Sequence, residues 1–179
     1  PGALYKNGAS FGAAALSAVY DGPSDQLSVK VKRLALEETT FTAQAALTNV
    51  SSKEIALKAD GQFSEMPVAT LKAFWPRGLG EGGRKWVTEN IDDGRWTATQ
   101  LRANAPLSEF ADDTAPADAL EIRFELTDAV AHYRRPMPPL IGGAASARMT
   151  LDNMRFDIAS GVIGGVDVAG STVVLNSFR

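Results

Sequence analysis

Cysteine is absent from this chain, which excludes thiol catalysis, disulfide bonds and metal sites with thiolate ligands. Histidine is scarce: His132 is the sole one, so a metal site built from several histidines is excluded as well. No apolar run reaches the roughly 18 residues of a membrane-spanning helix, and the N-terminal residues lack the basic and apolar regions of a signal peptide. Either the chain is cytosolic, or it is an internal segment of a longer protein.

The residues that are present suit one ordinary globular domain. A chain of 179 residues can bury roughly 70% of the surface that it exposes when unfolded. Hydrophobic residues make up 45% of the sequence and charged residues 22%, so a core is available without a metal or disulfide. The net charge of -3 is mixed in sign and provides no basic surface for phosphate groups. We therefore expect neither a nucleic-acid partner nor a cofactor.

Alternating apolar and polar residues predict a mainly β chain with antiparallel neighbours. A period of two, typical of a strand with one buried face, runs through residues 27–32, 41–47 and 55–63. The turn-prone TNVSSKE segment separates the second of these from the third. The clearest strand is 120–127, in which Leu120, Ile122, Phe124 and Leu126 alternate with polar residues.

The pattern becomes helical near residues 67–93, which we interpret as a short insertion that caps the sheet. Leu71 and Trp75 lie at helical spacing, and Pro76 is expected to end the first helix. A second helix is expected to end at Gly94, since glycine commonly follows the last helical residue.

Strand character returns after this insertion. The apolar phase moves from Trp96 and Ala98 to Leu101 and Ala103, which predicts a β-bulge. A loop and then two further strand pairs are expected towards the C-terminus, for roughly eight to ten strands in all. The predicted fold class is mainly β: an antiparallel curved sheet, in the form of a groove or a sandwich.

Motifs that can carry catalysis lack the context they need. Residues 78–83 satisfy GxGxxG, but no strand precedes them and no βαβ unit surrounds them, which favours a turn between helices. His132 has no obvious partner in the sequence, and no GxSxG motif accompanies it. The pairs Asp92–Asp93 and Asp112–Asp113 can act as acid and base or bind a cation, although adjacent aspartates more often occupy helix ends and loops.

Two further segments each keep two interpretations. The tryptophans at 75, 86 and 96 either pack together as a core or line an apolar cavity. The proline-rich residues 134–139 form either a rigid connector or a recognition segment with polyproline character.

The run from Phe74 to Leu107 resembles a stretch of AsmA-like bacterial envelope proteins. There, a tryptophan-proline pair precedes a short helix that ends in W-(V/I)-x-x-(N/A)-I-x-x-G. The matching positions here are Trp75, Pro76, Trp86, Val87, Asn90, Ile91 and Gly94. The flanking segments QFSEMPV, LEIRFELTDAVAHY and PPLIGGAASARMTL also fit, so the resemblance extends from Ala9 to the C-terminus.

The resemblance implies that residues 1–179 form a single β-groove module of a longer periplasmic protein. That protein would be anchored to the inner membrane through a segment absent from this sequence. Members of this superfamily, including the YhdP and TamB types, are implicated in moving phospholipid between the inner and outer membranes. No catalytic residues come with the resemblance, so a non-enzymatic protein without a metal is expected.

A hydrophobic groove for phospholipid acyl chains is therefore the leading hypothesis, with adjacent segments of the same long chain as further partners. Its candidate lining residues are Phe41, Leu47, Ile55, Leu57, Leu120, Ile122, Phe124 and Leu126. The alternative is a structural or interaction β-sandwich, in which the same side chains form a closed core and bind no lipid.

Overall fold

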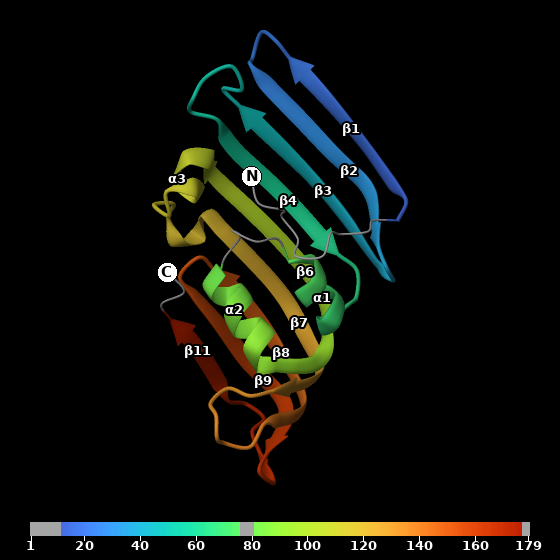
Figure 1. Cartoon of the computed structure of the whole chain (residues 1–179), viewed down its shortest axis with the longest axis vertical. Helices are drawn as coiled ribbons and strands as arrows, with labels where there is room; N and C mark the ends of the chain where they lie inside the picture. The colour runs from blue at the N-terminus through green and yellow to red at the C-terminus, as the bar shows by residue number, and fades with distance from the viewer. Residues whose placement is uncertain (1–11, 76–80, 177–179) are drawn as a thin grey trace.

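One antiparallel sheet organises the chain in the computed structural model, which describes residues 12–75 and 81–176 (Figure 1). Its strands are β1 (Ala14–Asp21), β2 (Gln26–Leu36), β3 (Thr39–Thr48), β4 (Ala56–Phe63), β5 (Met66–Pro67), β6 (Ile91–Pro106), β7 (Leu120–Ala131), β8 (Leu140–Thr150), β9 (Asn153–Ile163), β10 (Val166–Asp167) and β11 (Thr172–Asn176). The order is β1-β2-β3-β4-β6-β7-β8-β9-β10, while β5 pairs with β6 and β11 pairs with β9. The predicted mainly β, antiparallel fold is confirmed in its open, curved form.

Most of the predicted strands are found where the alternation placed them. Strands β2, β3 and β4 are successive antiparallel neighbours, as predicted. Strand β1 was not predicted, because AALSAVYD carries apolar residues on both faces and so shows no alternation. The predicted loop after β6 contains two short helical elements, α3 (Leu107–Ala111) and the 3-10 helix η1 (Ala117–Ala119).

The helical insertion is shorter than the predicted 67–93. It consists of α1 (Val68–Phe74) and α2 (Glu81–Asn90), and Ile91 already pairs with Ala131 as the first residue of β6. The prediction that Gly94 ends the second helix is wrong. Helix α2 ends at Asn90, four residues earlier, and strand pairing begins at Ile91. Gly94 is instead a buried residue of β6 with φ +132°. Pro76, predicted to end the first helix, lies outside the described residues.

The predicted bulge in β6 is confirmed by a register shift between Thr97 and Gln100. Its geometry differs from the prediction at Ala98, which is exposed rather than on the apolar face. Ala98 adopts φ +50° and takes up the extra residue of the bulge. Thr99 therefore turns to the apolar face, where it is 4% exposed.

The core lies on one face of the sheet, beneath the two helices of the insertion. Figure 1 shows α1 and α2 in front of the central strands, with no described helix over β1–β3. Buried apolar side chains of β6, β7, β8 and β9 pack there with Val68, Trp75 and Val87 from the helical segment. Burial decreases towards β1, in which every residue is exposed.

Candidate functional site

A continuous apolar surface crosses one face of the sheet. Residues that pair across antiparallel strands project to the same face, so the strand register defines rows of neighbouring side chains. One row contains no polar side chain from β1 to β11: Leu16, Val31, Ala43, Gly61, Leu101, Ile122, Met149, Met154 and Leu175. We call this surface the apolar face.

The helices cover only part of the apolar face. Four predicted lining residues on β7 are between 2% and 8% exposed and belong to the core: Leu120, Ile122, Phe124 and Leu126. Three others, Phe41, Leu47 and Leu57, are half-buried on β3 and β4, and Leu47 pairs directly with Leu57. On β1, Leu16 is 66% exposed. Seven of the eight candidates are therefore divided between a closed core and an open part of the apolar face.

Ile55 is the eighth candidate and lies just before β4, so it is not part of a strand. It is half-buried, and its carbonyl oxygen accepts a hydrogen bond of 2.8 Å from the N–H of Leu107. This bond ties the start of β4 to the start of α3. The structure thus places Ile55 at one end of the sheet, outside the ladder that brings Leu47 and Leu57 together.

A cavity of about 260 Å³ lies where α1 meets the less covered strands; we call it the α1 cavity. Its walls come from β2, β3, β4, β5, β6, β7, β8 and the α1 segment: Leu34, Leu36, Phe41, Phe63, Met66, Leu71, Phe74, Trp75, Trp96, Thr99, Leu101, Ile122 and Met149. Sequence reasoning named Phe41 and Ile122 as lining residues, and it gave a cavity wall as one of two roles for Trp75 and Trp96. It missed the others because contact with α1 depends on how the helix docks.

A second apolar cavity, of about 170 Å³, lies on the α2 side and is called the α2 cavity. Its walls are mainly apolar: Trp86, Ile91, Leu126, Ala129, Ala131, Tyr133, Leu140, Gly143, Ala145, Phe156, Ile158, Ile163, Val168, Ser171 and Val173. Both cavities therefore open along the same face of the same sheet.

Aromatic rings connect the walls of the two cavities. Trp96 stacks on Phe124 at a centroid distance of 3.7 Å, and Trp75 meets Trp96 edge-on at 6.3 Å. On the other side, Phe124 contacts Phe156 at 6.2 Å, and Phe156 contacts Trp86 at 5.8 Å. The tryptophans thus fulfil both predicted roles, since they pack in the core and also line the cavities.

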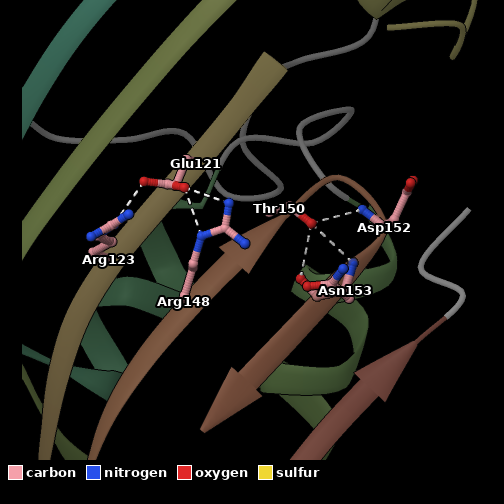
Figure 2. Close-up of polar contacts among 6 residues, drawn as sticks. All are labelled: Glu121, Arg123, Arg148, Thr150, Asp152 and Asn153. Atoms are coloured by element: carbon pink, nitrogen blue, oxygen red, sulfur yellow. Dashed lines mark hydrogen bonds and ion pairs between the residues drawn. The ribbon is translucent and has the colours of Figure 1, made fainter. Parts of the chain in front are cut away.

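The opposite face of the sheet is polar and carries ion pairs. Figure 2 shows Glu121 between two arginines: its Oε1 accepts from Arg123 Nε at 2.7 Å and its Oε2 from Arg148 Nε at 2.6 Å. The hydrogen bond from Arg123, followed by that from Arg148, lowers the pKa of Glu121 below its ordinary value. At the turn from β8 to β9, Thr150 Oγ1 accepts the N–H groups of Asp152 and Asn153 (Figure 2).

Glu121→Gln should reduce stability at neutral pH, by up to about 1 kcal/mol for each surface ion pair. Because the folded-state pKa of Glu121 is lowered from its ordinary value of 4.5, the stabilisation is present well above pH 4.5 and is lost as the pH falls through the lowered pKa. Urea unfolding from pH 7 to pH 3 should therefore show a shallower acid loss in the variant. Glu125→Gln, on the same strand face, is the control, and an identical response of both variants would contradict the assignment.

The structure corrects one statement about the catalytic candidates. His132, for which the sequence offered no partner, lies with Nε2 at 3.0 Å from Asp92 Oδ2. Asp93 Oδ1 accepts the N–H of Gly94, and the N–H of Asp112 bonds to the carbonyl of Ser108 at the end of α3. Within residues 12–75 and 81–176, no three potential metal-ligating side chains lie together. The His132–Asp92 pair thus connects the start of β6 to the residue that follows β7.

The GxGxxG segment is only partly described. Residues 78–80 lie outside the described residues, and 81–83 form the first turn of α2. In the part of the chain that the structure describes, no helix is long and apolar enough to cross a membrane.

The chain is thus an open β-groove protein: an antiparallel sheet has one apolar face, and two short helices cover that face only in part. A comparison with family models matches residues 8–179 to the family described as YhdP protein, and the chain belongs to the YhdP family. The sequence resemblance to AsmA-like, YhdP-type proteins is thereby confirmed, and the family is associated with the bacterial envelope. No curated protein and no solved structure matched the chain.

Proposed function

We propose that the apolar face binds phospholipid acyl chains and forms part of a non-enzymatic conduit for phospholipid between the inner and outer membranes. The observation that carries this proposal is the unbroken apolar row from β1 to β11, whose part on β1–β3 has no described helix over it. In this proposal the chain works in the periplasm, and the full-length protein is held at the inner membrane.

The dimensions of the sheet suit this role. Strand β3 has 10 residues and spans about 33 Å, longer than the roughly 15 Å of hydrocarbon in one bilayer leaflet. Each buried methylene group contributes about 0.8 kcal/mol, so partial cover of an acyl chain offsets its exposure to water. The contacts are non-directional, which lets a chain slide along the face. The polar face remains in water.

Native mass spectrometry of the full chain, purified after bacterial expression, tests the proposal directly. Phospholipid should remain bound under gentle conditions and appear after extraction with organic solvent. A lipid-free protein that also fails to take up phospholipid from vesicles would contradict the proposal.

Ala45→Asp should remove bound lipid, whereas Ala46→Asp should retain it. The two alanines are neighbours on β3 and both are half-buried, but Ala45 pairs with Val29 and Ala59 on the apolar face. Ala46 pairs with Ser28 and Lys58 on the polar face. A carboxylate against an acyl chain loses its hydration, so we expect at least about a tenfold loss of lipid per protein for Ala45→Asp.

Circular dichroism should show both alanine variants folded, because the open part of the apolar face leaves the carboxylate in water when no lipid is present. Equal lipid content in the two variants would place the binding surface elsewhere.

A structural or interaction role is the second candidate, and β1 favours it. Among the described residues no strand pairs with the outer edge of β1, and Leu16, Val19 and Tyr20 are 66%, 66% and 53% exposed. An edge of this kind is suited to pairing with another strand, here an adjacent segment of the same long chain. In this role the sheet would extend end to end, and no lipid would copurify.

A further inference from the structure

Three hollows on the polar face of the sheet join into one trough. Their volumes are about 380, 510 and 450 Å³, and neighbouring hollows share part of their walls. Lys30, Gln44 and Asp60 line both the first and the second hollow, and Gln100 lines both the second and the third. The joined hollows extend across the strands from β1 to β9, and we call them the polar trough.

The polar trough is basic, although the whole chain has a net charge of -3. Many carboxylates lie outside it, for example Glu89 in α2 and Asp118 in η1. The carboxylates that line it belong to Asp60, Glu125 and Asp157. The cationic lining residues outnumber them: Lys30, Lys32, Lys58, Arg102, Arg123 and Arg148. The fold therefore gathers positive charge that the composition of the chain conceals.

Three of these cations form no ion pair. Lys30, Lys32 and Lys58 are exposed, and none of them is paired with a carboxylate of the residues that the structure describes. Arg102 differs, since its Nε lies 3.5 Å from Asp60 Oδ1. The lysines come from β2 and β4 and line the first two hollows, so their charges add to one positive potential there.

Three arginines form a row at the other end of the trough. Arg123 pairs directly with Arg148 across the strands, and Arg148 pairs with Arg155. Like charges directly opposite each other destabilise a sheet, and here two hydrogen-bonded carboxylates serve three guanidinium groups. Glu121 accepts from Arg123 and Arg148 (Figure 2), and Asp157 accepts twice from Arg155. Folding gains nothing from such a row, whereas an anionic partner would be attracted by it.

The other lining groups indicate the kind of anion. Gln44, Gln62 and Gln100 are exposed on β3, β4 and β6, and their amides can both donate and accept hydrogen bonds. A polypeptide backbone offers the complementary N–H and C=O groups, while acidic side chains can meet the cations. The bases of a nucleic acid would find no exposed ring to stack on, because Phe124, the aromatic residue among the described lining residues, is 2% exposed.

We infer that the polar trough binds an acidic, extended segment of a partner protein. The lysines and arginines hold the carboxylates of the segment, and the glutamine amides bond to its backbone. The inference goes beyond the proposed function, because the acyl chains are assigned to the apolar face and the trough lies on the opposite one. The same sheet then holds lipid on one face and a protein on the other.

Fluorescence anisotropy of a labelled peptide, titrated with the full chain, tests the inference. The probe is a short peptide of alternating glutamate and serine, and its control carries glutamine in place of glutamate. The glutamate peptide should bind and the glutamine peptide should not. Binding should weaken strongly from about 0.01 M to 1 M salt, over which the Debye length falls from roughly 30 Å to 3 Å.

The double variant Lys30→Gln/Lys58→Gln should bind the glutamate peptide about 3–10-fold more weakly at low salt. Circular dichroism should show it folded, because neither lysine is part of an ion pair. The double variant Lys72→Gln/Lys85→Gln is the matched control. It removes the same charge from α1 and α2, which lie over the apolar face, and should leave the affinity unchanged.

Four other outcomes would overturn the inference. Equal weakening by the two double variants would show that net charge, rather than the trough, attracts the peptide. Failure of the glutamate peptide to bind would remove the evidence for a protein partner. Tighter binding of oligothymidylate or of phosphatidylglycerol vesicles would assign the trough to a nucleic acid or to a bilayer surface. Loss of copurified lipid from the Lys30→Gln/Lys58→Gln variant alone would mean that the trough serves the bound lipid.

Discussion

Phe124→Asp is expected to unfold the protein. The ring of Phe124 is 2% exposed, stacks on Trp96 at 3.7 Å and meets Phe156 edge-on. An aspartate here loses these contacts and buries an unpaired carboxylate, which together cost several kcal/mol. That is comparable to the whole stability of a typical domain, about 5–15 kcal/mol. Near-ultraviolet circular dichroism should lose the aromatic signal, and the protein should be recovered mainly as aggregate.

Arg123→Asp is the control for that experiment, because its side chain is 63% exposed on the polar face. It removes one ion pair of Glu121, which should lower stability by about 1 kcal/mol or less without loss of fold. A folded Phe124→Asp variant that lost its lipid would show that this strand lines an open groove instead. The variants at Phe124 and Arg123 therefore test whether the apolar side of β7 is a closed core or an open groove. This test does not depend on the variants at Ala45 and Ala46 on β3.

Gly94→Ala is expected to destabilise the protein by about 2–5 kcal/mol, from backbone strain and overpacking together. Gly94 has φ +132°, and an added Cβ would lie 3.1 Å from both Ala129 Cα and Thr127 O. Both contacts are to backbone atoms of β7, which cannot rotate away. Urea unfolding should show a lower midpoint with an unchanged slope.

Gly142→Ala separates the two causes. Gly142 also has positive φ, +59°, but a Cβ there would meet no atom within 4 Å. Only backbone strain remains, and the expected loss is about 1 kcal/mol. Equal losses in the two glycine variants would mean that the contact between Gly94 and β7 contributes nothing.

The strands that the sequence predicts well are those whose pattern is local. Along β7, Leu120, Ile122 and Leu126 are buried, while Arg123 and Glu125 are exposed, as the alternation requires. The bulge in β6 was also predictable, because a change of apolar phase within one strand has few other causes. Its exact geometry was not, since Ala98 and Thr99 exchange faces through a backbone conformation that leaves no mark in the residue pattern.

The predicted groove residues differ in burial for a reason that the alternation of apolar and polar residues does not contain. Phe41 and Phe124 carry the same side chain on alternating strands, yet Phe41 is half-buried in a cavity wall and Phe124 is enclosed in the core. The difference comes from where α1 and α2 dock, which depends on contacts between segments far apart in the chain. The pairing of His132 with Asp92 is another such contact, formed only when β6 and β7 lie side by side.

The sequence by itself determined the mainly β class, the antiparallel neighbours and the existence of one apolar face, because side-chain alternation in a strand follows directly from residue order. The resemblance to AsmA-like proteins, with the YhdP type among them, was likewise readable from the residues around Trp75 and Trp86, and the match of residues 8–179 to the YhdP family confirms it. Only the tertiary structure decided which part of the apolar face is covered, and which polar side chains, such as Thr99, are enclosed beneath the cover. Both depend on the docking of the helical insertion and on close packing between strands, and neither follows a period along the chain.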